Sequence, residues 1–350
     1  MKKHHKCIFC GSLSTRRHGK VTRKYKLPLQ RFKCLDCTKT FTLGSDNRQY
    51  ISKSLQIDIT RTHLEGGTSI RTIARHKEIS KTTVVKAIHE VTAQCVTAAW
   101  IASSLNPKWS GYLGVDGKMI RVWDWAAKFF RYAKEQKRLL HKMSLIACVD
   151  LGTLDIPIHH LGEEETSIDL KICLDQLKEL GYPLKGYVTD GNDDIRKIVE
   201  MVFGKIPHQL CVVHFLRNLR IKMGSGIITE EQYLDARFHI LRGKRPTLLI
   251  VPDDLFTYQK VKGLPRTNQI AENFFRFVAL RMKTFNIFRS WKTATNYLNA
   301  FVLYRRFKKF EDCKGKNKSF NGFAPLELAG CDIKGLDYLD LNIKHSKMVR

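Results

Sequence analysis

Acidic residues are scarce in this 350-residue sequence. Asp and Glu number 33 against 61 Lys and Arg, which gives a formal net charge of +28 at pH 7. Such an excess favours a polyanionic partner, either nucleic acid or an anionic membrane surface. The membrane is the weaker hypothesis, because no apolar run approaches the roughly 20 residues that span a bilayer. The first residues, MKKHHKCIFC, also lack the apolar segment of a secretion signal. We therefore expect a nucleic acid partner and no membrane.

Internal repeats and low-complexity tracts are also absent, which argues against a solenoid and against a chain dominated by linkers. The length allows two or three domains with a full-sized core. Ten cysteines occur without a secretion signal. We therefore expect a cytoplasmic protein, because in a reducing compartment cysteines bind metal or pack in the core and do not form disulfides.

Two Cys-x2-Cys pairs stand near the start of the chain, Cys7 with Cys10 and Cys34 with Cys37. Each pair can give two thiolates to one ion, so the four cysteines predict a closed structural Zn²⁺ site and residues 1–45 a zinc ribbon. The segment has too few large apolar residues to fold as a reduced core without such a staple. The two pairs are further apart than in the usual ribbon. Three histidines therefore remain alternative ligands, namely His4, His5 and His18.

Residues 46–106 predict short helices. One covers residues 51–64, and the stretch TSIRTIARHKEISKTTVVKAI predicts two more, joined by a tight turn and with Ser80 capping the second. This pattern is typical of a helix-turn-helix, whose second helix contacts DNA. A plain three-helix packing unit is the alternative. The candidate DNA contacts on the second helix are Lys81, Thr82, Thr83 and Lys86.

From residue 107 the pattern becomes α/β. Apolar runs predict strands at 112–115, 118–123, 143–149 and 156–161, a helix at 166–180, a strand at 187–189 and a helix that Asn192 caps. Asp116-Gly117 and Asp190-Gly191 each follow a strand, where ligands and metal ions gather in open α/β sheets. The alternative is that both Asp-Gly pairs are only turns. The element order is the one that a ribonuclease H-like core requires, with the strands before Asp116 and Asp190 as neighbours.

The core continues beyond the strand that precedes Asp190. A second apolar run, 210–213, carries Cys211-x2-His214 and ends the first part of the core, 107–214. Residues 215–262 predict a mostly helical insertion, and residues 263–330 begin with a long helix that contains Glu272. Alone, Glu272 is best explained as an ordinary helical glutamate paired with Arg276 at i+4. Residues 331–350 form a tail.

Four stretches together resemble DDE transposases of the insertion-sequence and Mutator-like group. These are GVDGKMIRV around Asp116, VTDGNDDIRK around Asp190, CVVHFLRNL from Cys211 and TNQIAENFFRFVALRMKTFNIF around Glu272, and the ending NGFAPLELAG is similar as well. The resemblance covers residues 111–330 and implies a ribonuclease H-like core in which Asp116, Asp190 and Glu272 hold two Mg²⁺ or Mn²⁺ ions. Asp193 and Asp194 fall inside a helix rather than at a strand end. Cys211 and His214 are implied to support the site or contact DNA.

The implied activity is transposition. A water would first expose a 3′-hydroxyl at the end of the mobile element, and that hydroxyl would then attack target DNA, both on a two-metal site. The implied partner is double-stranded DNA, bound by a homodimer or higher oligomer associated with the nucleoid. Arg276, Arg281 and Lys283 are expected to flank the catalytic groove. Further along, a basic surface is expected to contain Arg305, Arg306, Lys308 and Lys309.

Two alternatives stay open at this point. One is a catalytically inactive, transposase-derived DNA-binding regulator, although such a decayed core should have lost at least one carboxylate. The other is a structure-selective nuclease with the same two-metal site, which the sequence cannot separate from a transposase because only the attacking hydroxyl differs.

Overall fold

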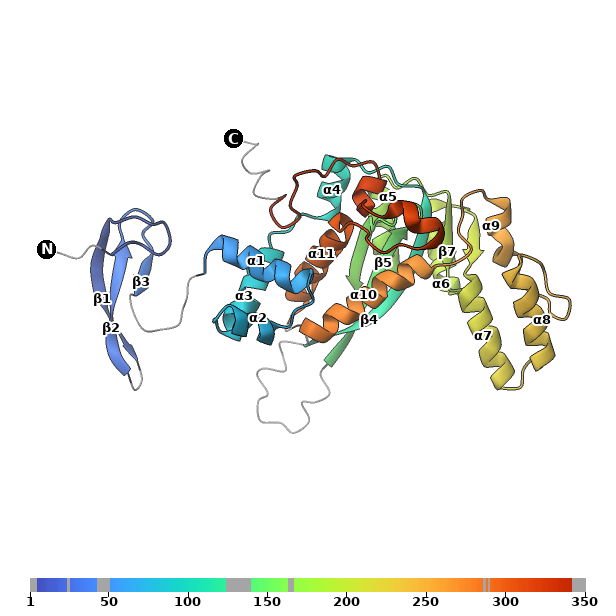
Figure 1. The fold of residues 1–350 in the computed structure, drawn as a ribbon, viewed down its shortest axis with the longest axis horizontal. Helices are drawn as coiled ribbons and strands as arrows, with labels where there is room; N and C mark the ends of the chain where they lie inside the picture. The colour runs from blue at the N-terminus through green and yellow to red at the C-terminus, as the bar shows by residue number, and fades with distance from the viewer. Residues whose placement is uncertain are drawn as a thin grey trace.

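The computed structural model describes residues 5–23, 26–42, 51–123, 140–162, 167–285, 288 and 290–341. It is a mixed α/β protein (Figure 1). His4, the expected boundary at residues 45 and 46, and the last part of the expected tail lie outside the described residues. Within those ranges, no helix combines the length and the apolarity needed to cross a membrane.

The N-terminal unit is a small antiparallel sheet of β1 (Thr15–Arg23), β2 (Lys26–Cys34) and β3 (Thr40–Thr42). Its buried cluster contains Cys7, Phe32, Cys34 and Phe41, with Phe9 and Cys37 packed against them. So small a cluster stabilises little structure without a staple.

Four helices follow: α1 (Lys53–Leu64), α2 (Ile70–His76), α3 (Lys81–Thr92) and α4 (Ala98–Leu105). The first three lie close to the positions expected, and α4 was not predicted. The side-chain oxygens of Ser52, Ser69, Ser80 and Thr97 accept hydrogen bonds from the N3 backbone of α1 to α4 respectively. Of these caps, Ser80 is the signal that made the start of α3 predictable.

The central sheet has the strand order β6-β5-β4-β7-β8. Its members are β4 (Tyr112–Trp123), β5 (Leu140–Asp150), β6 (Ile158–Gly162), β7 (Gly186–Thr189) and β8 (His208–Leu210). The first three pair antiparallel, and β7 and β8 run parallel to β4. Crossovers through α5 (Ser167–Glu179) and α6 (Asp193–Phe203) make this parallel pairing possible.

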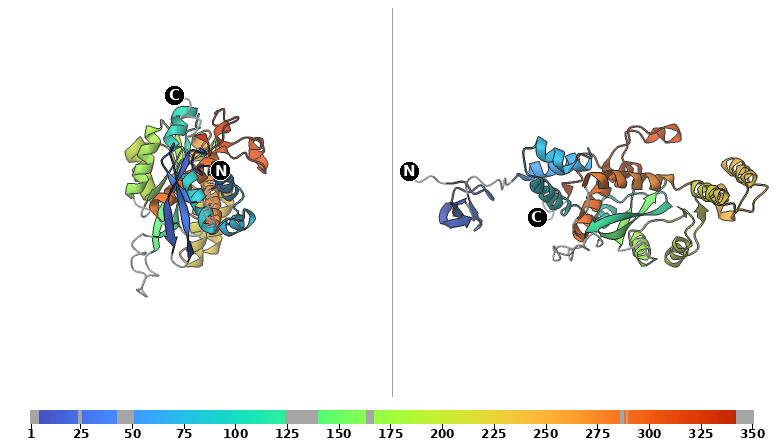
Figure 2. Two further views of the ribbon diagram at one scale, coloured as in Figure 1. Left: turned by 90° about the vertical axis from the view of Figure 1, so that its left-hand side faces the viewer. Right: turned by 90° about the horizontal axis from the view of Figure 1, so that it is seen from below.

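Two helical layers cover the sheet. On one face, α5 and α6 bury Leu174 and Val199 against Val115 and Ile146. On the other face, α10 (Gln269–Phe285) and α11 (Trp291–Phe307) share one hydrophobic cluster with β5 and with α1 to α3. Figure 2 shows this second layer extending from α1 to α3, in blue, across the sheet. Because this cluster is continuous, α1 to α3 belong to the same packed layer as the helix that carries Glu272, and α3 packs against α11.

A helical insertion extends from the opposite end of the core (Figures 1 and 2). It comprises α7 (Val212–Gly224), α8 (Glu230–Leu241), the short helix η3 (Asp253–Phe256) and α9 (Thr257–Lys260). It has a hydrophobic cluster of its own, which includes Leu219, Ala236 and Phe256. These helices run from Val212 to Lys260, close to the range 215–262 that the sequence predicts to be mostly helical. The chain then ends in η4 (Gly315–Phe320) and α12 (Pro325–Leu328).

Two sequence-based boundaries were wrong. Residues 112–115 and 118–123 belong to one strand, because Asp116 and Gly117 stay in register with Ala147 and Ile146 of β5. The strand expected over 210–213 ends at Leu210, and α7 begins at Val212. Cys211 therefore caps a helix, and His214 lies in its first turn.

Candidate active site and metal centres

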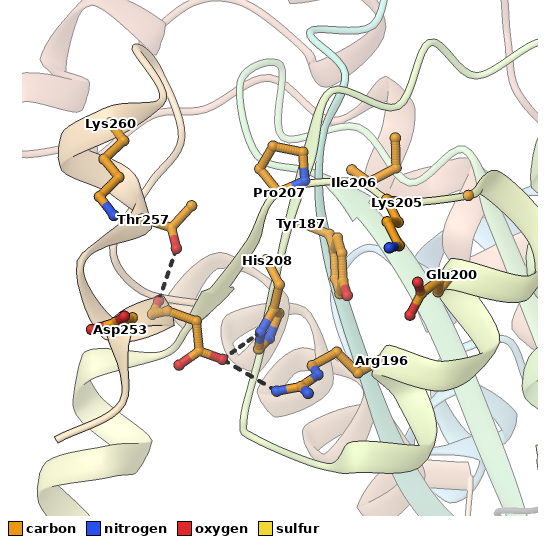
Figure 3. Close-up of a pocket in the computed structure, with 12 residues that line it drawn as sticks. Tyr187, Arg196, Glu200, Lys205, Ile206, Pro207, His208, Asp253, Thr257 and Lys260 are labelled. Carbon is orange, nitrogen blue, oxygen red and sulfur yellow. Dashed lines mark hydrogen bonds and ion pairs between the residues drawn. The ribbon is translucent and has the colours of Figure 1, made fainter.

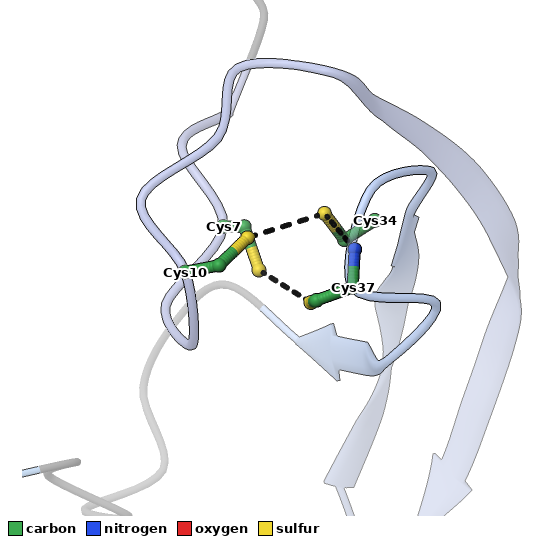
Figure 4. Close-up of side chains that lie close together, drawn as sticks. All are labelled: Cys7, Cys10, Cys34 and Cys37. Atoms are coloured by element: carbon green, nitrogen blue, oxygen red, sulfur yellow. Dashed lines mark hydrogen bonds between the residues drawn. The ribbon is translucent and has the colours of Figure 1, made fainter. Parts of the chain in front are cut away.

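The four N-terminal cysteines form a compact group (Figure 4). The Sγ atoms of Cys7 and Cys37 lie 3.6 Å apart, as do those of Cys10 and Cys34, and all four Sγ atoms lie within 4.8 Å of one another. A tetrahedral ion with Zn–S bonds of about 2.3 Å needs sulfurs roughly 3.8 Å apart. The group can therefore bind a structural metal such as Zn²⁺.

The histidine alternatives near this group have other surroundings. The ring of His5 packs edge-on against Phe32 at 4.7 Å, and the backbone oxygen of His18 accepts a hydrogen bond from Arg31. Neither histidine belongs to the metal-binding group among the described residues. The four cysteines are thus the ligand set that the fold brings together.

Asp116 lies on β4, and Asp190 comes directly after the neighbouring strand β7. Gly114 of β4 pairs with Val188 of β7 in a parallel ladder, so two residues further along, Asp116 stands beside Asp190. Asp116 lies within β4 and is half-buried, whereas Asp190 follows β7 and is exposed. The two Asp-Gly pairs therefore differ in structure. Only Gly191 has a left-handed φ, of 101°, and the turn it makes leads into α6.

Asp116 has an unusual electrostatic environment. The pKa of its carboxyl is raised to about 6, chiefly by burial and also by the negative charges of Asp190 and Glu272, while a hydrogen bond from the Gly117 backbone and the charge of His214 oppose the shift. Charges that come from β4, β7 and α10 thus act on one another. Crowded carboxylates of this kind favour either a proton or a cation.

Glu272 lies in the first turn of α10. Its carboxylate is 3.5 Å from Nδ1 of His214 and 4.0 Å from Nη2 of Arg217, so the expected ordinary pairing with Arg276 is not what surrounds it. Oε1 of Glu272 and Nδ1 of His214 are both buried and form no hydrogen bond. The glutamate therefore faces the start of α7 as well as the two aspartates.

Cys211 and His214 complete this corner of the site. Burial alone would raise the pKa of the Cys211 thiol, but hydrogen bonding to His214 and to the Asn268 backbone lowers it below its usual range. The same contact with Cys211 raises the pKa of His214, and the charge of Glu272 adds to that effect. Cys211, His214 and Glu272 form the second metal-binding group among the described residues, with ligand atoms within 4.8 Å of one another.

Asn268 is a further residue of the site, directly before α10. It is buried, its backbone N–H donates to Sγ of Cys211 at 3.3 Å, and its Nδ2 donates to the Val115 carbonyl at 3.0 Å. Its own carbonyl accepts from the Glu272 backbone. Asn268 therefore ties the start of α10 to the strand residue that precedes Asp116.

An unpredicted feature is a hydrogen-bond chain under the Asp190 turn. Oδ2 of Asp254 contacts Nδ1 of His208 at 2.8 Å, and Nε2 of His208 contacts Oγ1 of Thr189 at 2.9 Å. Oγ1 of Thr189 in turn accepts from the Gly191 backbone at 3.3 Å. Figure 3 shows the His208 end of this chain in a surface pocket of about 390 Å³. The chain connects the insertion to the turn beside Asp190, and its long-range contacts left no signal in the sequence.

The candidate DNA-binding residues fall into two groups. Lys81, Thr82 and Lys86 are exposed on α3, and Thr83 lies at its start, bonded to the cap Ser80. Arg276 and Lys283 are exposed on α10.

Two other arginines have structural partners. Nη2 of Arg281 donates to the Glu65 carbonyl at 2.8 Å and so ties α10 to the end of α1. Arg306 does not belong to a basic surface: it is 1% exposed and pairs with buried Asp155 through two contacts of 2.8 Å. The expectation for Arg306 was wrong, because helical spacing does not reveal which side of a C-terminal helix faces the core.

Comparison with protein-family models found no match for this chain, and a search among curated proteins found none either.

Proposed function

We propose that the protein is a DDE transposase that cleaves the ends of its mobile element and joins them to target DNA. The observation that carries this proposal is the approach of three carboxylates, Asp116, Asp190 and Glu272, from segments far apart in the sequence. Burial raises the pKa of Asp116, and the negative charges of Asp190 and Glu272 add to that shift, which supports this approach.

The donor set suits hard divalent cations. All three side chains offer oxygen, which Mg²⁺ and Mn²⁺ prefer, and an oxygen of Glu272 is buried without a hydrogen bond. The three carboxylates do not form one single-ion group of the kind seen at Cys211. Two ions about 3.5–4 Å apart require ligands that are spread over a wider space than one ion needs. The separation of the three carboxylates is therefore compatible with a pair of ions.

The sheet topology supports the same proposal. A strand order of β6-β5-β4-β7-β8, with three antiparallel strands followed by two parallel ones, is the order expected of a ribonuclease H-like core. The first aspartate lies on the central strand, and the second follows its parallel neighbour. The glutamate comes from a helix packed on the opposite face from α5 and α6.

Each part of the chain then has a role. Bound Mg²⁺ or Mn²⁺ ions would activate the attacking hydroxyl and stabilise the leaving oxygen. Asp116, Asp190 and Glu272 would hold these ions, while Asn268 and the Thr189 chain keep their backbones in place. Exposed basic side chains such as Arg276 and Lys283 would bind the phosphates of double-stranded DNA. Helix α3, as the second helix of a helix-turn-helix, would contact the bases. A dimer or larger oligomer at the nucleoid would pair the two element ends.

The test is cleavage of a labelled DNA fragment that carries the element's own ends, with Mg²⁺ or Mn²⁺ present. We expect Asp116→Asn, Asp190→Asn and Glu272→Gln each to lower cleavage by at least about 100-fold, as losses of electrostatic contacts to a transition state do. Asp193→Asn is the matched control. This residue is exposed in the first turn of α6, so its variant should cleave like the wild type.

The outcomes separate the hypotheses. Specific binding of the ends without cleavage by the intact protein would favour a DNA-binding regulator. Cleavage without joining to a target fragment would favour a nuclease. Equal activity of Asp190→Asn and Asp193→Asn would refute the assignment of Asp190.

A further inference from the structure

The group formed by Cys211, His214 and Glu272 has the dimensions of a single-ion site. The three ligand atoms lie within 4.8 Å of one another, and Nδ1 of His214 is 3.5 Å from Oε1 of Glu272. Tetrahedral zinc with bonds of about 2.0–2.3 Å separates its ligand atoms by roughly 3.3–3.8 Å. Small adjustments of side chains would therefore bring all three atoms to bonding distance of one ion.

Two of the three ligand atoms lie close together in the interior, 3.5 Å apart. Nδ1 of His214 and Oε1 of Glu272 are buried and form no hydrogen bond. Leaving such an atom unsatisfied in the interior is destabilising. A cation between them would accept a lone pair from each and remove both penalties.

The backbone holds the group in place. Cys211 caps α7, His214 lies in the first turn of that helix, and Glu272 lies in the first turn of α10. The two helix starts are joined by a hydrogen bond from the Val212 backbone to the Arg266 carbonyl. The Asn268 backbone donates to Sγ of Cys211, as outer-shell donors do for metal-bound thiolates.

The chemistry of the donors selects the ion. Thiolate and imidazole favour Zn²⁺ over Mg²⁺, and a thiolate with a carboxylate balances two positive charges. We infer that Cys211, His214 and Glu272 form a second Zn²⁺ site, distinct from the four-cysteine group, with one coordination position open to water or to an oxygen ligand. Three protein ligands with one open position is the pattern of accessible zinc sites rather than of closed structural ones.

The site has a consequence that rests on the proposed function. A zinc ion there engages Glu272, the carboxylate that the Mg²⁺ pair would also use. Zinc and the catalytic Mg²⁺ arrangement then compete for one side chain, so that Glu272 belongs to one site or the other.

Zinc content tests the site without any cleavage assay. The full-length protein is loaded with Zn²⁺, passed through a desalting column and analysed by atomic emission. We expect two Zn²⁺ per chain for the wild type and one for Cys211→Ser and for Glu272→Gln. Cys34→Ser should also retain one, from the Cys211 group. Cys313→Ser is the matched control, because Cys313 belongs to neither metal-binding group, and it should retain two.

Circular dichroism melting identifies any variant that fails to fold, and the near-isosteric Glu272→Gln provides an independent variant of the same site. One Zn²⁺ in the wild type, lost in Cys34→Ser and kept in Cys211→Ser, overturns the proposal. Asp116→Asn separates this proposal from the proposed function. It should abolish cleavage if the transposase assignment is correct, while both zinc ions remain bound.

Discussion

The buried pair of Arg306 with Asp155 gives the sharpest stability prediction. Nε and Nη2 of Arg306 each donate to a different oxygen of Asp155 at 2.8 Å, and both residues are at most 1% exposed. Trp109 donates one further hydrogen bond to the same carboxylate. Replacing Arg306 with Met keeps much of the side-chain volume but leaves that carboxylate with one side-chain donor.

Removing one partner of a buried ion pair costs about 3–5 kcal/mol, because the other charge stays buried without compensation. At about 2–4 °C per kcal/mol for a large domain, the melting temperature of the core should fall by roughly 6–20 °C. The double variant Asp155→Asn with Arg306→Met should melt above the single Arg306→Met, since it has no unpaired charge.

The measurements are thermal melting by circular dichroism and DNA affinity at a fixed salt concentration. Arg305→Met is the matched control. That guanidinium lies over the Phe277 ring at 4.1 Å and has no buried carboxylate partner in the described structure, so its loss should cost about 0.5–1 kcal/mol. The reasoning fails if Arg306→Met melts within 2 °C of the wild type. It also fails if that variant loses DNA affinity while its melting temperature is unchanged, as a surface arginine would.

Three further predictions concern pH, zinc and the Asp190 turn. Burial, and then the charge of Arg306, lower the pKa of His159 from 6.5 to about 4. Between these two pH values the unfolded chain binds a proton that the folded chain does not. About 3 kcal/mol of stability should therefore be lost between pH 6.5 and 4 in urea titrations, with a smaller loss in His159→Gln. Cys34→Ser should make the N-terminal sheet sensitive to protease while the core melts as in the wild type, because that sheet has its own hydrophobic cluster; a lower melting temperature of the core would contradict this. His208→Gln should lower DNA cleavage roughly 10–100-fold, the usual range for outer-shell partners, with DNA affinity unchanged. Undiminished cleavage would show that the hydrogen-bond chain through His208 to the Asp190 turn is dispensable.

Local signals carried much of the prediction. Ser80 marked the start of α3, Asn192 marked the start of α6, and both side chains accept the backbone hydrogen bonds that such caps make. The cysteine pairs likewise encode a metal-binding group in their spacing alone. In these cases the information lies within a few residues of the feature, so one sequence is sufficient.

Long-range pairing explains the errors. Asp116-Gly117 has the composition of a turn, but the ladder with β5 keeps it extended, whereas Asp190-Gly191 has no such partner strand and turns. Arg306 has the same sequence signal as Arg305, Lys308 and Lys309, because its partner Asp155 is distant in the sequence. Cys211 was assigned to a strand because the apolar run around it does not reveal that β8 ends at Leu210.

The arrangement around Asp190 joins the insertion to the candidate active site. β8 contributes His208 to the hydrogen-bond chain, and the next residue, Gln209, bonds the Leu255 carbonyl and the Tyr258 backbone of the insertion. Two consecutive residues of one short strand thus hold the insertion and the Asp190 turn together. A movement of η3 relative to β8 would change the contact between Asp254 and His208. Because His208 also bonds Thr189, that change would be passed on to the turn at Asp190. If DNA binds along α7 and α8, this strand offers a covalent and hydrogen-bonded route by which binding can alter the position of Asp190.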